Sequence, residues 1–488
     1  MLGKKKVRQE NLFFPARRQV TGKHGLLRDM NAHIDFTPFR ERAAAYFSDV
    51  GRPSIDPAVM VKMMFLGYLF GIRSDRAIVE EVIDRDSFRE FIGYGPEEDI
   101  PTHANFTNWR QKLGPQVFKD FLGDIVCQCQ KGGMRLGSCR LFDSTRVKAR
   151  ASKDSSAKVE LELSEQPDEY LDAFDWQSQT DKAEDDPRYG KKLVINTNDP
   201  EARLIRHGNE PSRFVHKAHF EIDSATGLVV NTMAGHKSDH LAMVELLRQE
   251  SRHVDSIGAD KGYSAVECFR ELEKMGIKGF IPVLDHSNDK GNKYHLADFT
   301  YREEEGAYIC PGGNVLRFVC IDSKGNKRYQ AKATDCSVCP LRLACISKGK
   351  RRTLTVNADR LLIEKMKFYG RLPKYARVMR KRKTLMEGTF GHAKVWCGMH
   401  RARGIGNDAM EIQAAVTAVV IDVKKLIAHL RRASSGAYWH VLRLFGRFRR
   451  LPAALQAVFR PHIAYTRSEL VKVRLGANHP IILEKGTC

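Results

Sequence analysis

The sequence predicts an α/β protein in which a mixed sheet is flanked by helices, an all-helical domain precedes the sheet, and a cysteine-rich insertion interrupts it. Three observations support this fold class. Short helical patterns fill the region before residue 125, strand and helix patterns alternate between residues 138 and 284, and cysteines cluster between residues 285 and 355. Alternating strand and helix patterns are typical of layered α/β folds.

The chain is strongly basic. Among its 488 residues, 81 are Lys or Arg and 59 are Asp or Glu, so the formal net charge is +22. This charge favours a polyanionic partner, above all nucleic acid, over a basic surface kept for solubility. No stretch reaches the ~20 apolar residues of a membrane span, and no apolar signal-peptide core follows the basic N-terminus. We therefore expect a cytoplasmic protein with no membrane partner, whose eleven cysteines are thiols or metal ligands rather than disulfides.

The N-terminal part is interpreted as a leader, residues 1–55, followed by a helical domain, residues 56–125. Pro57 opens an apolar run, and Ser74 and Thr102 are placed to cap two further helices. Short helices joined by short turns ahead of a basic body suggest a helical DNA-binding domain. Helical packing without a DNA contact predicts the same periodicity, so both interpretations stay open.

The first part of the α/β core is predicted at residues 138–284. It opens with the strand RLFDSTRVKA at 140–149, which carries a single acid, and an acidic insertion at 151–190 follows. After the insertion we expect two paired strands, a helix, a short buried strand ending at Asp260, a helix and a last strand. These elements are expected at 213–223 and 228–234, 239–253, 256–259, 265–275 and 278–284.

The α/β pattern stops at the cysteine-rich insertion, residues 285–355, where charged loops are expected. It resumes as the second part of the core, residues 356–432, with helical segments at 359–395 and 409–430. Residues 433–488 are interpreted as a basic C-terminal tail.

Three acids stand out as candidate catalytic residues. Asp143 lies within a predicted strand, Asp260 ends a buried strand just before a turn signal, and Glu387 lies in a helical segment. Burying a carboxylate within a strand or at its end costs free energy unless the carboxylate is paired or bound to a metal. Carboxylates that converge from strands and a helix suit magnesium, and two such ions can promote phosphoryl transfer. Taken singly, each acid is more often a turn or surface residue.

The helix around Glu387 combines an acid with bases on one face. Arg380, Glu387 and Lys394 are spaced seven apart, and Lys383 precedes Glu387 by four, so the four side chains share a face. A neighbouring stripe of the same helix is apolar. This arrangement suits a helix that holds a metal and contacts phosphates, while an exposed amphipathic helix with ordinary ion pairs is the alternative.

Three segments occur in a characteristic order: LFDSTRVKARAS at 141–152, IGADKGYS at 257–264 and RKRKTLMEGTFGHAKVWCGMHRARG at 380–404. In this order they resemble bacterial insertion-sequence transposases of the DDE class, whose core is RNase H-like. The helical region RPSIDPAVMVKMMFLGYLFGIRSDRAIVEEVIDRDSFREFIGY at 52–94 resembles the N-terminal domain that accompanies them. The resemblance extends from about Arg52 to Leu430.

This resemblance implies a catalytic triad of Asp143, Asp260 and Glu387 that binds Mg²⁺ or Mn²⁺. It implies cleavage of DNA at insertion-sequence ends, followed by attack of the freed 3′-hydroxyl on target DNA. The partners would be double-stranded DNA and further copies of the chain, in the nucleoid of a bacterial cytoplasm. Two rival functions stay open: a domesticated DNA-binding protein that does not cut, and an RNase H-like nuclease without strand transfer.

The bases near Glu387 depart in part from the family pattern. Arg380 and Lys383 stand where the broader group often has a tyrosine and an arginine, whereas Lys394 matches its later lysine. Together with Arg401 and Arg403, these bases are expected to contact phosphates. Such contacts give affinity rather than sequence specificity.

The cysteines of the insertion have the spacing of metal ligands. Cys310, Cys336, Cys339 and Cys345 give C-x25-C-x2-C-x5-C, with Cys320 as a spare. A C-x2-C pair followed by another cysteine suggests a zinc knuckle, and unligated thiols in a loop are the alternative. Zinc here would be structural, because thiolates and transposase chemistry favour different metals.

Two other groups of candidate ligands have simpler explanations. His236 and His240 flank a predicted helix start, where Ser238 or Asp239 is expected to act as a cap. Cys127 and Cys129 lie in an apolar helical pattern and are expected to pack in a core.

Overall fold

The computed structural model describes residues 2–3, 25–48, 50, 53–95, 97–159, 193–206, 211–283, 294–322, 326–346, 349–357 and 359–448. Met1–Leu426 form one compact unit and Ile427–Cys488 a second, of which only the end of one long helix is described. Three predicted segments fall largely outside the described residues: positions 4–24 of the leader, 160–190 of the acidic insertion, and the tail beyond 448.

The N-terminal part is helical, as its capping signals predict. Asp56 begins one helix by accepting a hydrogen bond from the Ala58 amide at 2.9 Å, with Pro57 in the first turn. Ser74 caps the next helix, whereas Thr102 precedes the longest one without a side-chain cap. The elements are α1 (Gly25–His33), α2 (Thr37–Ala44), α3 (Pro57–Leu69), α4 (Asp75–Asp84), α5 (Asp86–Ile92) and α6 (His103–Lys131).

An aromatic cluster forms the core of these helices. Phe36 and Phe39 lie with their ring centroids 5.9 and 5.3 Å from that of Phe121. Phe36 also contacts Phe65 and Phe91 edge to face. Such aromatic pairs add stability beyond their buried area. Because Phe36 and Phe39 belong to the span interpreted as a leader, the packed helical layer begins before residue 56.

The central sheet is mixed. Its strand order is β6–β5–β1–β7–β8, and β4 pairs with the beginning of β5. β5 is antiparallel to β1 and β6, whereas β7 and β8 run parallel to β1. An antiparallel hairpin on one side of β1 and parallel strands on the other confirm the expected RNase H-like mixed sheet. The bounds are β1 (Cys139–Lys148), β4 (Arg203–Ile205), β5 (Arg213–Asp223), β6 (Val229–Ala234), β7 (Ser256–Gly258) and β8 (Lys278–Phe280).

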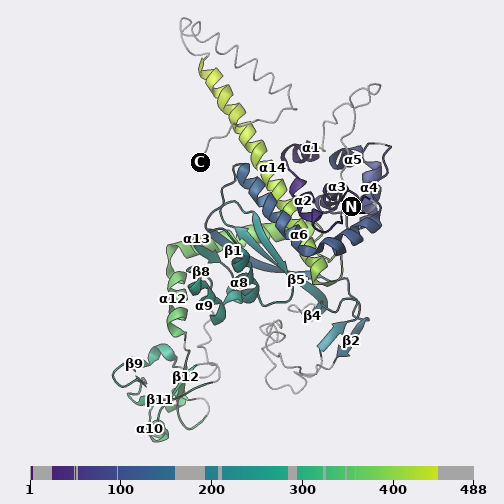
Figure 1. The fold of residues 1–488 in the computed structure, drawn as a ribbon. Helices are drawn as coiled ribbons and strands as arrows, with labels where there is room; N and C mark the ends of the chain where they lie inside the picture. Colours follow the sequence, from purple (N-terminus) through teal and green to yellow (C-terminus); the bar gives the residue numbers. More distant parts are fainter. Residues whose placement is uncertain are drawn as a thin grey trace. The chain divides into compact units, whose positions relative to one another are not determined.

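Helices cover both faces of the sheet (Figure 1). On one face, α8 (Asp239–Gln249), α9 (Val266–Lys274) and α12 (Arg360–Arg371) share a hydrophobic core with Phe142 and Ile257. On the other face, α13 (Pro373–Val395) places Phe390 against Phe220, with ring centroids 5.2 Å apart. A small separate hairpin pairs β2 (Ser156–Val159), which lies within the predicted acidic insertion, with β3 (Leu193–Asn196), which follows that insertion.

Two long helices also belong to the core. α6 kinks at Gly114, whose φ of 65° lies in the left-handed region that favours glycine. α14 (Gly406–Phe448) is buried on all sides between Met410 and Leu426, which is typical of a central helix. The Cys129 thiol of α6 donates to the Asp422 carbonyl of α14 at 3.9 Å, so Cys129 packs between the two helices as expected. Cys127 is exposed on the same helix, so the expectation that it packs in a core is wrong.

The cysteine-rich insertion is folded, although its sequence suggests charged loops. It contains a five-stranded antiparallel sheet in the order β13–β12–β11–β10–β9. Charged residues on the exposed face of these short strands hide the strand pattern, and only a small cluster around Tyr308, Leu316 and Tyr329 is buried. The elements are η3 (Leu296–Asp298), β9 (Thr300–Arg302), β10 (Ala307–Ile309), β11 (Val315–Ile321), β12 (Lys327–Gln330), α10 (Ala333–Ser337), α11 (Arg342–Cys345) and β13 (Thr353–Val356).

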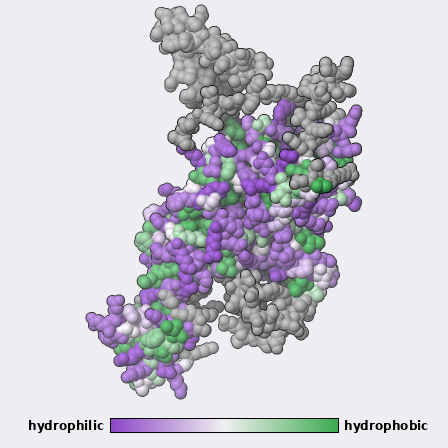
Figure 2. Space-filling model, viewed as in Figure 1, coloured by the Kyte–Doolittle hydropathy of each residue, from purple (hydrophilic) through white to green (hydrophobic). Residues whose placement is uncertain are grey.

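The surface is mainly polar on the face that Figure 2 shows, with small hydrophobic areas between hydrophilic ones. Across the part of the chain that the structure describes, no helix combines the length and the apolar character needed to cross a membrane.

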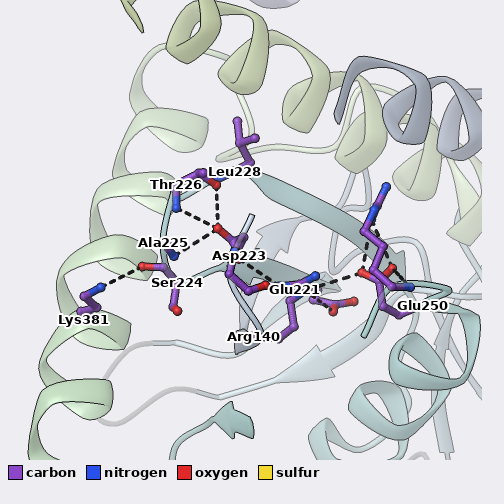
Figure 3. A network of polar contacts seen from close by, with 11 residues as sticks. Arg140, Glu221, Asp223, Ser224, Ala225, Thr226, Leu228, Glu250 and Lys381 are labelled. Carbon is purple, nitrogen blue, oxygen red and sulfur yellow. Dashed lines mark hydrogen bonds and ion pairs between the residues drawn. The ribbon is translucent and has the colours of Figure 1, made fainter. Parts of the chain in front are cut away.

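A buried ion network joins β1, β5 and the end of α8 (Figure 3). Arg140, 1% exposed, lies 2.9 Å from Asp223, 3.5 Å from Glu221 and 3.6 Å from Glu250. Burial, together with the neighbouring Glu250, raises the pKa of Glu221 to about 8 against the opposing effect of Arg140 and Arg252. The native state therefore holds a proton on Glu221 at pH values where the unfolded chain has lost it.

This proton makes stability depend on pH. A carboxyl whose folded-state pKa is raised from 4.5 to about 8 destabilises the fold progressively as pH rises through that interval. We expect the wild-type unfolding midpoint in urea to fall between pH ~5 and pH ~9, and Glu221→Gln to flatten this dependence. Glu267→Gln, an exposed change on α9, is the control and should keep the wild-type profile. A Glu221→Gln profile as steep as wild type would contradict the buried proton.

Candidate active site

Asp143 and Asp260 lie together because of the strand register. In the parallel pair of β1 and β7, Leu141 lies opposite Gly258. Asp143 comes two positions after Leu141, and Asp260 two positions after Gly258. The two aspartates therefore lie next to each other at the same end of the paired strands. The structure thus brings together two acids that are 117 positions apart in the chain.

A single guanidinium binds both carboxylates. Arg382 of α13 places one terminal nitrogen 2.9 Å from Asp143 Oδ2 and 3.4 Å from Asp260 Oδ2, and its Nε donates to the Phe142 carbonyl at 3.2 Å. Gly258 makes this approach feasible, because a Cβ there would lie 2.5 Å from Val378 Cγ1, one turn before Arg382. Arg382 is not among the predicted site residues, because it lies on a different helix face from Glu387 and the bases grouped with it.

The two acids also bind backbone amides. Asp143 Oδ1 accepts from the Ser144 amide at 2.9 Å, and Asp260 Oδ1 accepts from the Gly262 amide at 2.9 Å. Burial raises the pKa of Asp143 to about 6; Arg382 is the largest influence in the opposite direction, and Asp260 adds to the increase. Two carboxylates whose oxygens converge on one positive group form an oxygen donor set that suits a hard divalent cation.

A third carboxylate, Asp239, lies next to this pair. It stands in the first turn of α8, and its Oδ2 is 3.4 Å from the position that a Cβ on Gly262 would take. Lys217 lies 3.0 Å from Asp239 and His219 3.4 Å. Burial raises the pKa of Asp239, but Lys217 and His219 outweigh it, so the pKa is lowered. From the sequence Asp239 was expected only as a helix cap, and its place in the first turn of α8, shortly after β6, was the available signal.

Glu387 is not in contact with the aspartates in this structure. It is exposed on α13, five residues after Arg382, which at ~100° per residue turns it well away from the sheet. Among the described residues, no three His, Cys, Asp or Glu side chains are gathered closely enough to hold a metal ion. The structure therefore brings together Asp143 and Asp260 but leaves the predicted third acid apart.

The five predicted phosphate-binding bases have different surroundings. Arg380, Lys383 and Arg401 are exposed, and Lys394 is half-buried, which lowers its pKa. Arg403 is instead committed to the fold: its guanidinium lies 3.7 Å from the ring centroid of Tyr68. It also donates to the carbonyls of Ile72 at 2.8 Å, Gly67 at 3.1 Å and Cys397 at 3.3 Å. Those contacts engage both terminal nitrogens of the guanidinium, so the phosphate role expected for Arg403 does not fit this structure.

The four predicted metal-binding cysteines line one cavity. Cys310, Cys336, Cys339 and Cys345 surround a space of about 20 Å³, whereas exposed Cys320 on β11 does not line it. Burial raises the pKa of Cys345, and each of the other three cysteines raises it further.

The predicted histidine positions do not meet at a site. His236 is buried beside His216, with ring centroids 5.9 Å apart, and His240 contacts the Ser238 hydroxyl at 3.4 Å. Ser238 occupies the N-cap position of α8 without a side-chain cap hydrogen bond, and Asp239 is the first residue of the helix.

Comparison with known families gives two matches. Residues 14–112 match a family described as a transposase domain (DUF772), and residues 309–427 match a family described as a transposase DDE domain. The second match includes Glu387 and residues 309–355 of the cysteine-rich insertion but neither Asp143 nor Asp260. Together the matches confirm the resemblance to DDE-class transposases and to their N-terminal domain.

Comparison with whole proteins adds little. No curated protein matches the chain. A cryo-EM structure of a piggyBac transposase synaptic complex with hairpin DNA is similar at 12% identity and a TM-score of 0.34, covering 92% of this chain and 86% of that one. A TM-score this low does not establish a shared fold.

The contacts of Arg403 predict a structural role. Arg403→Lys keeps the charge but loses the planar group that stacks on Tyr68 and reaches several carbonyls. We expect a loss of about 2 kcal/mol in unfolding free energy, seen as a lower thermal midpoint, with unchanged DNA affinity at temperatures where the variant is folded. Arg401→Lys, an exposed change two positions away, should leave the midpoint unchanged. An unchanged midpoint for Arg403→Lys would contradict this role.

Proposed function

We propose that this chain, whose residues 14–112 and 309–427 match two transposase families, cuts DNA at the ends of an insertion sequence and joins the freed strands to target DNA. The family implies a DNA-cleaving enzyme, and DDE transposases generally use divalent metals. The observation that carries the proposal for this chain is the convergence of Asp143 and Asp260 on the Arg382 guanidinium.

In the proposed reaction, water attacks a phosphorus at the element end and the bond to the 3′-oxygen breaks, leaving a 3′-hydroxyl and a 5′-phosphate. The same hydroxyl then attacks a phosphorus of target DNA and displaces that strand's own 3′-oxygen. In both steps the nucleophile releases a proton to solvent and the leaving 3′-oxygen takes one up as a hydroxyl. No covalent bond between protein and DNA is required. A bound divalent cation would supply Lewis acidity for both steps.

Asp143 and Asp260 would hold this cation. Their Oδ2 atoms already converge on the Arg382 guanidinium, while the amides of Ser144 and Gly262 orient each carboxylate through Oδ1. Preorganised carboxylates of this kind lose little freedom on binding a metal. We propose Glu387 as the third acid on the family resemblance, and this requires α13 to present a different face than it does here.

DNA would lie along the exposed bases of α13 and the turn after it. Arg380, Lys383 and Arg401 are exposed, and Lys394 is accessible in part, so these four are the proposed phosphate contacts. Arg382 would reach the scissile phosphate once the carboxylates bind a cation. Pairing of two element ends would need a second copy of the chain, and base readout would come from the N-terminal helices.

Because Asp143 and Asp260 are proposed to act in the reaction, substituting either should lower DNA cleavage without weakening DNA binding. We expect Asp143→Asn and Asp260→Asn to lower Mg²⁺- or Mn²⁺-dependent cleavage of a supercoiled plasmid carrying the element ends by at least ~100-fold, because groups that act in the transition state are removed. Nicked, linear and strand-joined products are resolved on gels, and DNA affinity is measured in parallel. Glu267→Gln is the control. Simple nicks without joined strands would support a nuclease instead.

The third acid is assigned by comparing two further variants in the same assay. Loss of cleavage in Glu387→Gln with activity in Asp239→Asn would support the family triad, and the reverse would support Asp239. If the variants of all four acids cut DNA as well as wild type, the assignment of these carboxylates to the active site is wrong. Tight DNA binding with no cleavage by any form of the protein would favour a domesticated binding protein.

The exposed bases predict a change in the salt dependence of DNA binding. Each phosphate contact contributes about −0.9 to the slope of log K against log salt. The Arg380→Gln, Lys383→Gln double variant should therefore reduce the slope by about 2. A matched control removes the same charge elsewhere: Arg248→Gln with Lys274→Gln, two exposed bases that both pair with Glu271. Equal slopes for the two double variants would argue against α13 as the DNA surface.

A further inference from the structure

The cysteine-rich insertion brings four thiols around one small space. Cys310 follows β10, Cys336 lies in α10, Cys339 in the turn after it and Cys345 at the end of α11, and all four line the same cavity of about 20 Å³. A space of this size can hold about one water molecule or one bound ion. Four thiols from separate elements around such a space are unlike a lone surface cysteine.

The backbone around the thiols is arranged for thiolates. The Asn314 amide donates to Cys310 Sγ at 3.3 Å, and the Arg352 amide donates to Cys336 Sγ at 3.5 Å. Such amide–sulfur hydrogen bonds stabilise negative charge on the sulfur, as the outer contacts of a metal ligand do. Gly312 allows the sulfurs to approach, because a Cβ there would lie 3.0 Å from Cys339 Sγ and 3.7 Å from Cys310 Sγ.

Two arginines add positive charge beside the cavity. Arg342 donates to the Cys336 carbonyl at 3.3 Å, and Arg352 donates to the Cys345 carbonyl at 3.0 Å. Both side chains line the cavity together with the cysteines. They would offset the net negative charge that four thiolates leave around a divalent ion.

The insertion also needs a constraint beyond its apolar core. Its sheet buries only a small cluster, and small domains with little buried apolar area usually depend on metals or disulfides. The cysteines form no disulfides, so covalent cross-links do not supply this constraint.

We propose that Cys310, Cys336, Cys339 and Cys345 bind one structural zinc ion that holds the cysteine-rich insertion together. Zinc prefers four tetrahedral sulfur or nitrogen ligands in structural sites, and a closed four-thiolate set leaves no position for substrate. The thiols are not yet in ligand contact here, since no three metal-binding side chains of the described residues are gathered tightly. On binding zinc, the four cysteine side chains would therefore move closer together around the ion. The site is separate from the acid pair and does not depend on the proposed DNA chemistry.

The test is metal content of the full-length protein purified with zinc in the growth medium. We expect about one zinc per chain by elemental analysis, and after exchange into Co²⁺ the intense visible and near-ultraviolet bands of tetrahedral thiolate coordination. Cys339→Ser should lose most of the metal, while Cys339→His, which restores a zinc-binding nitrogen, should retain more. Cys320→Ser is the matched control, because Cys320 lies in the same insertion but outside the cavity.

These outcomes test the zinc site independently of the proposed DNA cleavage. Metal that is lost in Cys339→Ser and kept in Cys320→Ser supports the site whether or not the protein cuts DNA. Wild-type protein that carries no zinc, or a Cys320→Ser variant that loses as much as Cys339→Ser, would overturn the proposal. The Co²⁺ spectrum of the wild-type protein identifies the ligand type even if a cysteine variant fails to fold. A spectrum without sulfur-to-metal bands would also overturn the zinc proposal.

Discussion

The parallel pairing of β1 with β7 is the constraint on which the candidate active site depends. Side chains alternate between the faces of a strand, so a shift of one residue would turn Asp143 to the opposite face from Asp260. The observed register, Leu141 opposite Gly258, prevents this and leaves the two carboxylates on one guanidinium. Gly258 has a second effect, because its missing side chain lets Val378 approach and so sets how closely α13 lies on the sheet.

The buried network around Arg140 supports the same register from the other end of β1. Arg140 pairs across to Asp223 in the antiparallel ladder with β5, and its guanidinium also reaches Glu221 and Glu250. Buried ion pairs contribute little net stability, but they penalise alternatives in which a partner is left alone. A slipped β1 would bury Arg140 without its acids. We therefore interpret this network as a device that specifies which strand position carries Asp143.

Much of this arrangement could be predicted from the sequence, and the failures have physical causes. Asp143 and Asp260 were identifiable because acids within or after buried strands are unusual. Helical periodicity shows which residues of α13 share a face, but not which face meets the sheet, so Glu387 was grouped with its bases and Arg382 was missed. The role of Arg403 depends on Tyr68, more than 300 positions earlier, and no local pattern reports such a contact. The strands of the insertion were missed because few of their residues are buried.

Charge balance connects the acid pair to the rest of the proposed mechanism. Two close carboxylates repel each other and are partly buried, so they need a nearby positive group whenever both are ionised. Arg382 supplies that charge in this structure, and it does so from a different element than the sheet that carries the acids. If a divalent cation takes over this role, the guanidinium no longer has to neutralise the pair and becomes available to phosphate. Metal binding and DNA binding would then favour each other, because each uses a charge that the other releases.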